Sequence, residues 1–315
     1  MQRWRNHLAS LGVAVLGWGG LRVLILLLTG LLIWAGGSTY LGAVGSMQVR
    51  ISPPQPALGY TLSVEIITAD PPTFPPQVRW QQPSPTLGYP ASYPAFLIGN
   101  HHWRALVPTS PLDNPGVRQL EVQGWGSPQL SEVSLQKRDF PVQRIQLAPS
   151  VAGLEPTEME MTRVNQFRQQ ATSEKFWQAA FVPPGRGSVT TIYGVRRYYN
   201  GVFAENYYHR GIDYAGGVGS PVVAPADGRV GLVGLESAGF RLHGNIIGID
   251  HGQGVTSVFL HLSRIDVQEG DWVKAGQVIG GIGATGVATG PHLHWGLFVH
   301  NVSVDPVPWL HLHVP

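Results

Sequence analysis

The chain has 315 residues, of which 43% are hydrophobic and 13% are charged, and its formal net charge at pH 7 is +2. The composition is that of a globular protein with room for two domains, and the nearly balanced charge excludes the basic surface that binds nucleic acid. With 40 glycines, 26 prolines and few charges, short strands and turns are favoured over long helices, so we predict a mostly β protein. There is no cysteine, so cysteine usage does not indicate a compartment.

Residues 1–46 contain a long apolar stretch, Leu8 to Val44, which follows Arg3 and Arg5 and is interrupted by a single arginine. Its core has the length of the apolar region of a signal peptide, and the whole stretch reaches the ~20 residues that span a bilayer. Both interpretations export the residues from about Met47 onward, because the basic residues stay cytoplasmic. We therefore expect a signal peptide or a membrane anchor, and a periplasmic, cell-envelope or extracellular protein. The membrane is a partner only if this segment is not cleaved.

Residues 47–150 alternate β-prone runs with proline-rich turns. Apolar and polar residues alternate in the runs 60–66, 117–122 and 142–147, the pattern of a strand with one buried face. Short strands of this kind between Pro, Gly and Asn clusters are typical of a β-sandwich. We predict a small β-sandwich module for this region.

Residues 151–178 are predicted to be a helical linker, with the helix running from Glu155 to Trp177. Thr157 and Glu160 have the spacing of a capping box, in which each residue satisfies a backbone N–H near the helix start. Apolar residues recur at helical spacing, at Met161, Val164 and Phe167.

Residues 179–315 contain further predicted strands between glycine-rich turns. Strands are predicted at 221–224, 228–233, 245–249 and 255–260, and a hairpin at 273–280. The expected product is an antiparallel β module with a groove.

The segment Gly281 to Gly286 matches the Gly-x-Gly-x-x-Gly pattern of dinucleotide-binding proteins. That motif needs a helix directly after it, because the helix N-terminus holds the pyrophosphate. Here residues 287–291, Val-Ala-Thr-Gly-Pro, break any helix. We therefore expect no nucleotide partner, and we interpret the glycines as a tight loop that forms a wall of the groove.

A set of histidines and one aspartate in this region has the pattern of a metal site. His209 and Asp213 are four residues apart, and the pair His292 and His294 follows far downstream. Two imidazoles and a carboxylate are the donors of an open tetrahedral zinc site, in which water takes the fourth position. Residues two apart on a strand point to the same face, so one histidine of the pair can bind metal while the other faces the substrate.

Three motifs resemble those of peptidase family M23, the lysostaphin and LytM-like peptidoglycan hydrolases. They are His-x-x-x-Asp at 209–213, His-Leu-Ser at 261–263 and His-x-His at 292–294, in family order. The resemblance covers roughly residues 181–309. It implies that residues 179–315 form a peptidase module with the lipoyl-like, duplicated hybrid motif of the family. The predicted hairpin at 273–280 would carry the lipoyl-like turn of that motif. It also implies an immunoglobulin-like module before it.

The resemblance also implies the role of each residue. His209, Asp213 and His294 would bind Zn²⁺, and His261 and His292 would be the catalytic histidines. Histidine titrates near neutral pH and can pass a proton from water to the leaving amine, but the sequence does not decide which of the two is the base. Peptidoglycan peptides are the implied partner.

The function implied is that of an exported zinc metalloendopeptidase that cuts stem or cross-bridge peptides of bacterial peptidoglycan. One alternative is a non-catalytic peptidoglycan-binding or amidase-activating module, although such modules lose metal ligands and this sequence keeps them. Another is a zinc amidase that cuts the link between sugar and peptide with the same metal site.

Overall fold

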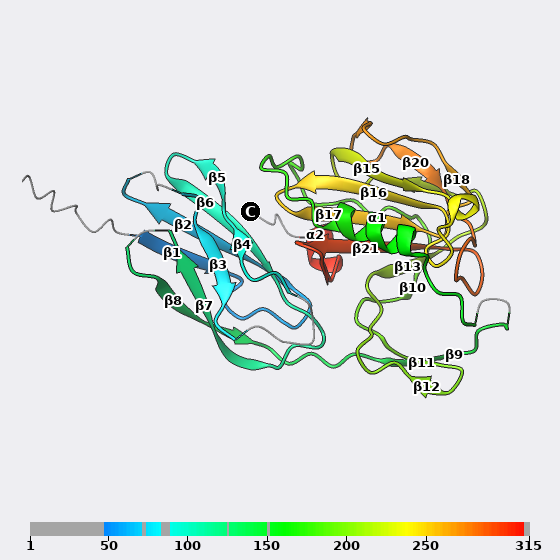
Figure 1. Ribbon diagram of the computed structural model, residues 1–315, viewed down its shortest axis with the longest axis horizontal. Coiled ribbons are helices and arrows are strands. Elements are labelled where there is room, and N and C mark those ends of the chain that lie inside the picture. The colour runs from blue at the N-terminus through cyan, green and yellow to red at the C-terminus, as the bar shows by residue number, and fades with distance from the viewer. Residues whose placement is uncertain (1–46, 71–73, 83–88, 125, 150–151, 312–315) are drawn as a thin grey trace, which may run out of the picture. The chain divides into compact units, whose positions relative to one another are not determined.

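The computed structural model describes residues 47–70, 74–82, 89–124, 126–149 and 152–311, and most of their regular structure is strand, as the composition predicts (Figure 1). These residues belong to one compact unit, residues 44–315. The signal peptide or anchor predicted for residues 1–46 lies outside the described residues. Among the described helices, none is both long enough and apolar enough to cross a membrane.

The first part of this unit is a β-sandwich of two four-stranded sheets, with the orders β1-β2-β6-β5 and β4-β3-β7-β8. Apolar side chains such as Leu62, Val78 and Leu120 form one buried core between the sheets. The strands predicted at 60–66 and 117–122 are confirmed as β2 and β7. The eight strands are β1 (Met47–Ser52), β2 (Thr61–Thr68), β3 (Gln77–Trp80), β4 (Tyr93–Pro94), β5 (Phe96–Gly99), β6 (His102–Pro108), β7 (Gly116–Gln123) and β8 (Gln129–Leu135).

The third strand predicted for the sandwich lies elsewhere. It forms β9 (Val142–Ile145), which pairs in parallel with β11 (Arg196–Tyr199), and β11 pairs in turn with β12 (Val202–Phe203). Its assignment to the sandwich was wrong because alternation predicts one buried face without specifying the partner strand. The chain between the sandwich and the helix therefore runs along the edge of the later β structure.

Helix α1 (Glu158–Arg168) is shorter than the helix predicted for Glu155–Trp177. The capping box of Thr157 and Glu160 is confirmed. Beyond the helix, the Thr172 hydroxyl donates to Asp250 and the Thr172 carbonyl accepts a hydrogen bond from the backbone N–H of Gln253. These tertiary contacts hold the segment against β16 (Ile246–Gly252) and prevent its continuation as a helix.

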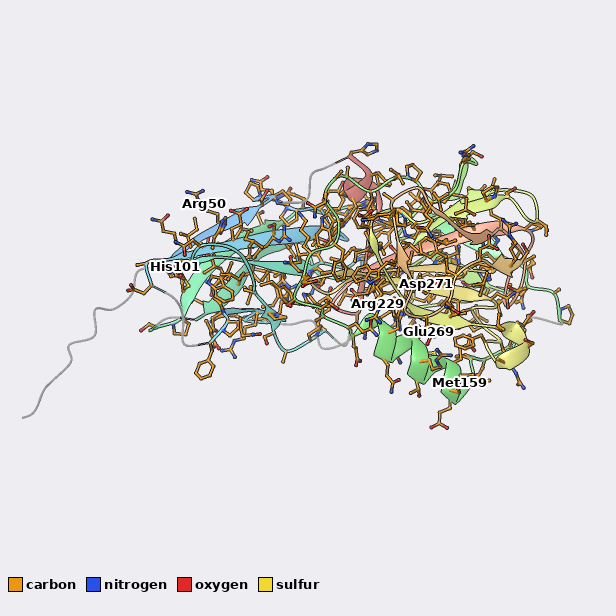
Figure 2. All side chains as sticks on the ribbon, turned by 90° about the horizontal axis from the view of Figure 1, so that it is seen from above. Arg50, His101, Met159, Arg229, Glu269 and Asp271 are labelled. Atoms are coloured by element: carbon orange, nitrogen blue, oxygen red, sulfur yellow. The ribbon has the colours of Figure 1, made fainter. Side chains whose placement is uncertain are left out.

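One side of helix α1 packs on a sheet. Val164 and Phe167 are buried there, whereas Met161 is 36% exposed, so the predicted apolar stripe is correct at two of its three positions. Arg163 pairs with Glu269, and Figure 2 shows Glu269 beside the helix and Met159 on it. The remaining helical segments among the described residues are the 3-10 turn η1 (Glu236–Ala238) and helix α2 (Val307–His311).

The second part is built on an eight-stranded antiparallel sheet with the order β10-β13-β21-β17-β16-β15-β19, and β22 pairs with β21. The strands predicted in the region 221–260 are confirmed as β14, β15, β16 and β17. Besides β11, β12 and β16, the strands of the second part are β10 (Val189–Thr191), β13 (Ile212–Ala215), β14 (Pro221–Val223), β15 (Gly228–Gly234), β17 (Val255–Leu260), β18 (Arg264–Ile265), β19 (Trp272–Val273), β20 (Val278–Gly281), β21 (His292–Val299) and β22 (Val302–Val304).

The hairpin predicted at 273–280 is wrong. β19 pairs with β15 in the large sheet, whereas β20 pairs with β14 and β18 in a separate three-stranded sheet. Val273 of β19 and Ile279 of β20 are both buried in the main core, but the two strands pair with different neighbours. Local sequence predicts the strands here but not their pairing.

Strand β21 divides its side chains between two environments. Leu293, Trp295 and Leu297 are buried in the larger apolar core. Phe298 belongs to a separate cluster on the side of helix α1, with Val164 and Phe167. Figure 1 shows α1 beside β16, β17 and β21. The helix therefore covers one part of this face and leaves the part that carries the histidines open.

Candidate metal centre and catalytic groove

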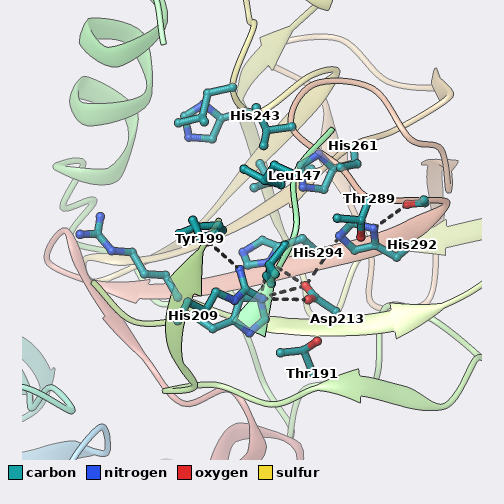
Figure 3. A pocket seen from close by; sticks show the side chains of 18 of the residues that line it. Leu147, Thr191, Tyr199, His209, Asp213, His243, His261, Thr289, His292 and His294 are labelled. Carbon is teal, nitrogen blue, oxygen red and sulfur yellow. Dashed lines mark hydrogen bonds and ion pairs between the residues drawn. The ribbon is translucent and has the colours of Figure 1, made fainter. Parts of the chain in front are cut away.

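The three predicted metal ligands come together on neighbouring strands (Figure 3). Asp213 on β13 is the register partner of His294 on β21, and His209 lies just before β13. His209 Nε2, His294 Nδ1 and Asp213 Oδ1 are each 2.9 Å from the other two atoms. A side chain at Gly211 would overlap the Trp295 carbonyl and lie 2.9 Å from His294 Cε1, so glycine allows this close approach.

The donor set fits a zinc ion. A tetrahedral ion with bonds of ~2.0–2.1 Å holds its ligand atoms roughly 3.3 Å apart, close to the observed separations. His209 Nδ1 donates to the Ile192 carbonyl at 2.9 Å, which leaves the lone pair of Nε2 directed at the cluster. Among the residues that the structure describes, His209, Asp213 and His294 are the one group of three or more such donors that could hold a metal.

The protonation states also suit a metal. Burial raises the pKa of Asp213, but the close contacts of its Oδ1 with His209 Nε2 and His294 Nδ1 outweigh it and hold that pKa well below its usual range. Burial lowers the pKa of His294 to about 4. At neutral pH Asp213 is therefore a carboxylate and His294 a neutral imidazole, the forms that bind metal ions. Arg197 Nη2 lies 3.6 Å from the second oxygen of Asp213 and helps to orient it.

His261 follows β17 and faces the same groove. Its φ of 64° is unusual for a residue other than glycine, and such backbone strain is concentrated at functional sites. Its backbone N–H donates to the His243 carbonyl at 3.1 Å, and its Nδ1 donates to the Thr285 carbonyl at 2.8 Å. Burial, assisted by the neighbouring histidines, lowers the pKa of His261 to about 3. The ring is therefore neutral at pH 7, with Nε2 free to accept.

His292 lies beside His261, with the two ring centroids 4.8 Å apart. Its Nδ1 donates to the Gly290 carbonyl at 2.8 Å, and its Nε2 is 3.9 Å from Asp213 Oδ1. Both predicted catalytic histidines thus have Nδ1 fixed by a carbonyl and keep Nε2 for a reactant. The structure brings all five predicted site residues into one place.

The site lies in a groove of about 690 Å³, and most of the residues that line this groove lie outside the three motifs. The glycine loop 281–286 was expected to form a wall, but the lining begins at residue 287, and Thr285 instead holds His261. No motif or spacing in the sequence indicated that the segment before and within α1 also lines the groove. That segment contributes Gln143, Ile145, Leu147, Gly153, Leu154, Val164 and Arg168.

Glu160 is a supporting residue that sequence reasoning found only as a helix cap. Its fully buried carboxylate accepts hydrogen bonds from the backbone N–H groups of Arg241, Leu242 and His243 and from His243 Nδ1. Burial would raise its pKa, but the hydrogen bonds from His243 and Leu242 lower it to about 2. Because the His243 carbonyl accepts the N–H of His261, Glu160 holds the loop that positions a predicted catalytic histidine.

An antiparallel sheet that carries convergent His-Asp-His donors beside two further histidines defines a candidate site for metal-dependent hydrolysis. Residues 207–306 match Peptidase family M23. The chain therefore contains an M23 peptidase domain, as the three motifs predicted.

Individual relatives support the same assignment. The chain is 41% identical over 123 residues to the glycyl-glycine endopeptidase ALE-1 of Staphylococcus capitis, covering 38% of this chain and 33% of that protein. It is 42% identical over 99 residues to the DD-carboxypeptidase/endopeptidase Mpg of Neisseria meningitidis, covering 31% of this chain and 22% of that protein. The matches thus span a third or less of these relatives' own length.

A solved structure from Pseudomonas aeruginosa assigned to peptidase M23 is similar over more of the chain. Its TM-score is 0.57 at 26% identity, and the similarity covers 82% of this chain and 95% of that one. This similarity therefore extends beyond the M23 domain into the residues that precede it.

Proposed function

We propose that the protein is a zinc metalloendopeptidase that hydrolyses peptide bonds in bacterial peptidoglycan. The main support is the convergence of His209, Asp213 and His294 beside two histidines with free Nε2 atoms, within an M23 domain. The names of the relatives support the substrate, since one is a glycyl-glycine endopeptidase and the other a DD-carboxypeptidase/endopeptidase.

His209, Asp213 and His294 would hold the zinc ion, with His209 fixed by the Ile192 carbonyl. When bound, zinc supplies a water acidified to a pKa of about 7 and a Lewis acid for the scissile carbonyl.

His261 and His292 perform the proton chemistry. Either histidine can accept a proton at Nε2 as water attacks, and the imidazolium so formed stabilises the negative charge that develops on the carbonyl oxygen. The proton then passes to the leaving amine. The carbonyls of Thr285 and Gly290 fix the ring orientation of the two histidines, so their Nε2 atoms are preorganised.

The proposal includes the organisation of the chain. Residues 1–46 serve as signal peptide or anchor, 47–150 as the region that contains the sandwich module and, after it, β9, 151–178 as the linker and 179–315 as the peptidase domain of an exported protein. A reporter fused after Gln55 is expected outside the cytoplasm, and a cytoplasmic reporter would contradict export.

Digestion of purified peptidoglycan by the exported chain tests the reaction. New amino groups on peptides are expected from an endopeptidase. Freed lactyl carboxyls would instead identify an amidase, and an absence of products with bound peptidoglycan would identify a binding module. The zinc-free protein, prepared with a chelator, should release no amino groups until zinc is restored.

A further inference from the structure

The groove continues along β21 beyond the histidines. His292, His294, Gly296 and Phe298 occupy alternate positions on this strand, so their side-chain positions face the same side. With a rise of ~3.3 Å per residue, Phe298 lies about 13 Å along the strand from His294. His292, His294 and Phe298 all line the groove. The groove therefore has a histidine end and a second end near Phe298.

Arg168, in the last turn of α1, lies at this second end. Its guanidinium carbon is 4.7 Å from the centroid of the Phe298 ring, and its side chain lines the groove although the residue is only 8% exposed. Its Nη2 donates to Asn165, but its Nε has no hydrogen-bond partner among the described residues. Burial lowers the pKa of Arg168 to about 10, and the nearby charge of Arg210 contributes.

Arg210 lines the groove between the two ends. It directly follows His209, and a side chain at Gly296 would lie 3.2 Å from the Arg210 carbonyl. The Arg210 guanidinium lies 5.9 Å from the ring centroids of both Tyr207 and Tyr208. The residue is exposed, so its side chain can move toward a ligand.

Neither arginine has a carboxylate partner among the described ion pairs. Asp213 is the one carboxylate residue among the described residues that line the groove, and it faces Arg197 and the histidines. Glu160, behind the wall, is bound to His243. A buried guanidinium without a counter-charge is costly, and a ligand carboxylate that matches its planar donors would relieve that cost.

We propose that Arg168 and Arg210 form an anion subsite that receives a carboxylate of the peptide substrate, about three or four residues from the scissile bond by the spacing of an extended chain. The inference rests on the proposed peptidase function. A subsite of this kind would make acidic peptides the preferred substrates of the groove. A glycine bridge has no side-chain charge and would leave the subsite unused.

The test uses the full chain and two synthetic peptides that differ at one position, with Glu in one and isosteric Gln in the other. The Glu peptide should have the higher kcat/KM, by on the order of tenfold to a hundredfold, because a hydrogen bond between charged groups is lost in the Gln peptide. In Arg168→Gln this Glu-to-Gln ratio should fall toward one. Arg163→Gln removes the same charge from the same helix outside the groove and should keep the wild-type ratio.

Arg168→Lys, measured with thermal unfolding of every variant, separates binding from structure. Partial retention of the ratio in Arg168→Lys supports a charge-based subsite, and so does a smaller decrease in Arg210→Gln. Equal hydrolysis of both peptides by the wild-type chain would overturn the subsite while leaving the peptidase function intact.

If neither peptide is hydrolysed by the zinc-loaded chain, the peptidase function fails, and equilibrium binding of the same two peptides decides the subsite. Tighter binding of the Glu peptide that is lost in Arg168→Gln would support the subsite. Equal binding of both peptides would overturn it.

Discussion

The two faces of strand β21 show how one strand serves stability and chemistry. On one face Leu293, Trp295 and Leu297 are fully buried in the larger core, and the Trp295 indole N–H is satisfied by Ser257 Oγ at 3.1 Å. On the other face His292 and His294 are partly exposed to the groove. The core face stabilises the fold through apolar burial. The groove face carries polar groups, whose burial costs free energy unless they are hydrogen-bonded.

The candidate metal ligands show the same contrast between the chemistry of the groove face and the stability of the core face. Three donor atoms of His209, Asp213 and His294 converge within 2.9 Å of one another, an arrangement that brings several lone pairs together. Polar groups gathered in this way add no apolar burial to the stability of the fold. The rigid strands β13 and β21 hold it in place, so changes on the two faces should have separable effects.

The largest effect is expected for His294→Ala. The change removes one of the three proposed ligands, so zinc and hydrolytic activity should be lost together, while the stability of the metal-free fold should change little. Zinc per chain by elemental analysis, the hydrolysis rate and urea unfolding in chelator measure the three quantities. A variant that retains full zinc occupancy would contradict the assignment of His294 as a ligand.

His292→Ala should keep the three ligands and the zinc while the rate falls by about 10²–10⁴-fold, because a proton-transfer or oxyanion partner is lost. The same zinc and rate measurements apply, and His294→Ala is the matched comparison on the same face. If His292→Ala lost its zinc and His294→Ala kept it, the two roles would be reversed.

The grouping of the five candidate site residues could be predicted from sequence because each motif is short and each side chain lies in or beside a β-strand. Asp213 and His294 are opposite one another on β13 and β21, and the motifs had already placed both residues in one candidate metal site. Alternation and turn residues also predicted some strands, namely β2 and β7 in the β-sandwich and β15, β16 and β17 in the main sheet.

Contacts between distant segments could not be predicted in this way. Strand β9 was recognised as a strand, but its partner β11 is about fifty residues away, and nothing in the alternation specifies it. Glu160 was visible as a cap, but its hydrogen bonds to the loop at 241–243 depend on how α1 packs. The place of Arg168 at the groove likewise depends on packing, which sets its guanidinium against the Phe298 ring.

Trp295→Ala tests the core face. Truncation of a fully buried tryptophan should destabilise the fold by about 3–5 kcal/mol, through lost burial and the cavity left behind. Urea unfolding of the metal-free protein measures the change, with His292→Ala as the control from the opposite face. A loss of similar size in His292→Ala would show that the two faces do not divide stability from chemistry.

The smallest effect concerns Glu160, which supports the groove face from helix α1. Its folded-state pKa of about 2 lies below the ordinary value of 4.5, so the ionised carboxylate stabilises the fold above about pH 4.5. That contribution, about 3 kcal/mol at most from the pKa difference, is lost as the pH falls from about 4.5 to 2. Glu160→Gln should therefore be less stable than the wild type by about 1–3 kcal/mol at pH 7.

The difference in stability between Glu160→Gln and the wild type should shrink as the pH is lowered through this window, because the wild-type carboxyl becomes neutral like the amide. Urea unfolding at several pH values between 7 and 3 measures it. Glu158→Gln is the control, since Glu158 is in the same helical turn but is exposed. A difference for Glu160→Gln that stays constant across this pH range would mean that the carboxylate charge does not hold the 241–243 loop.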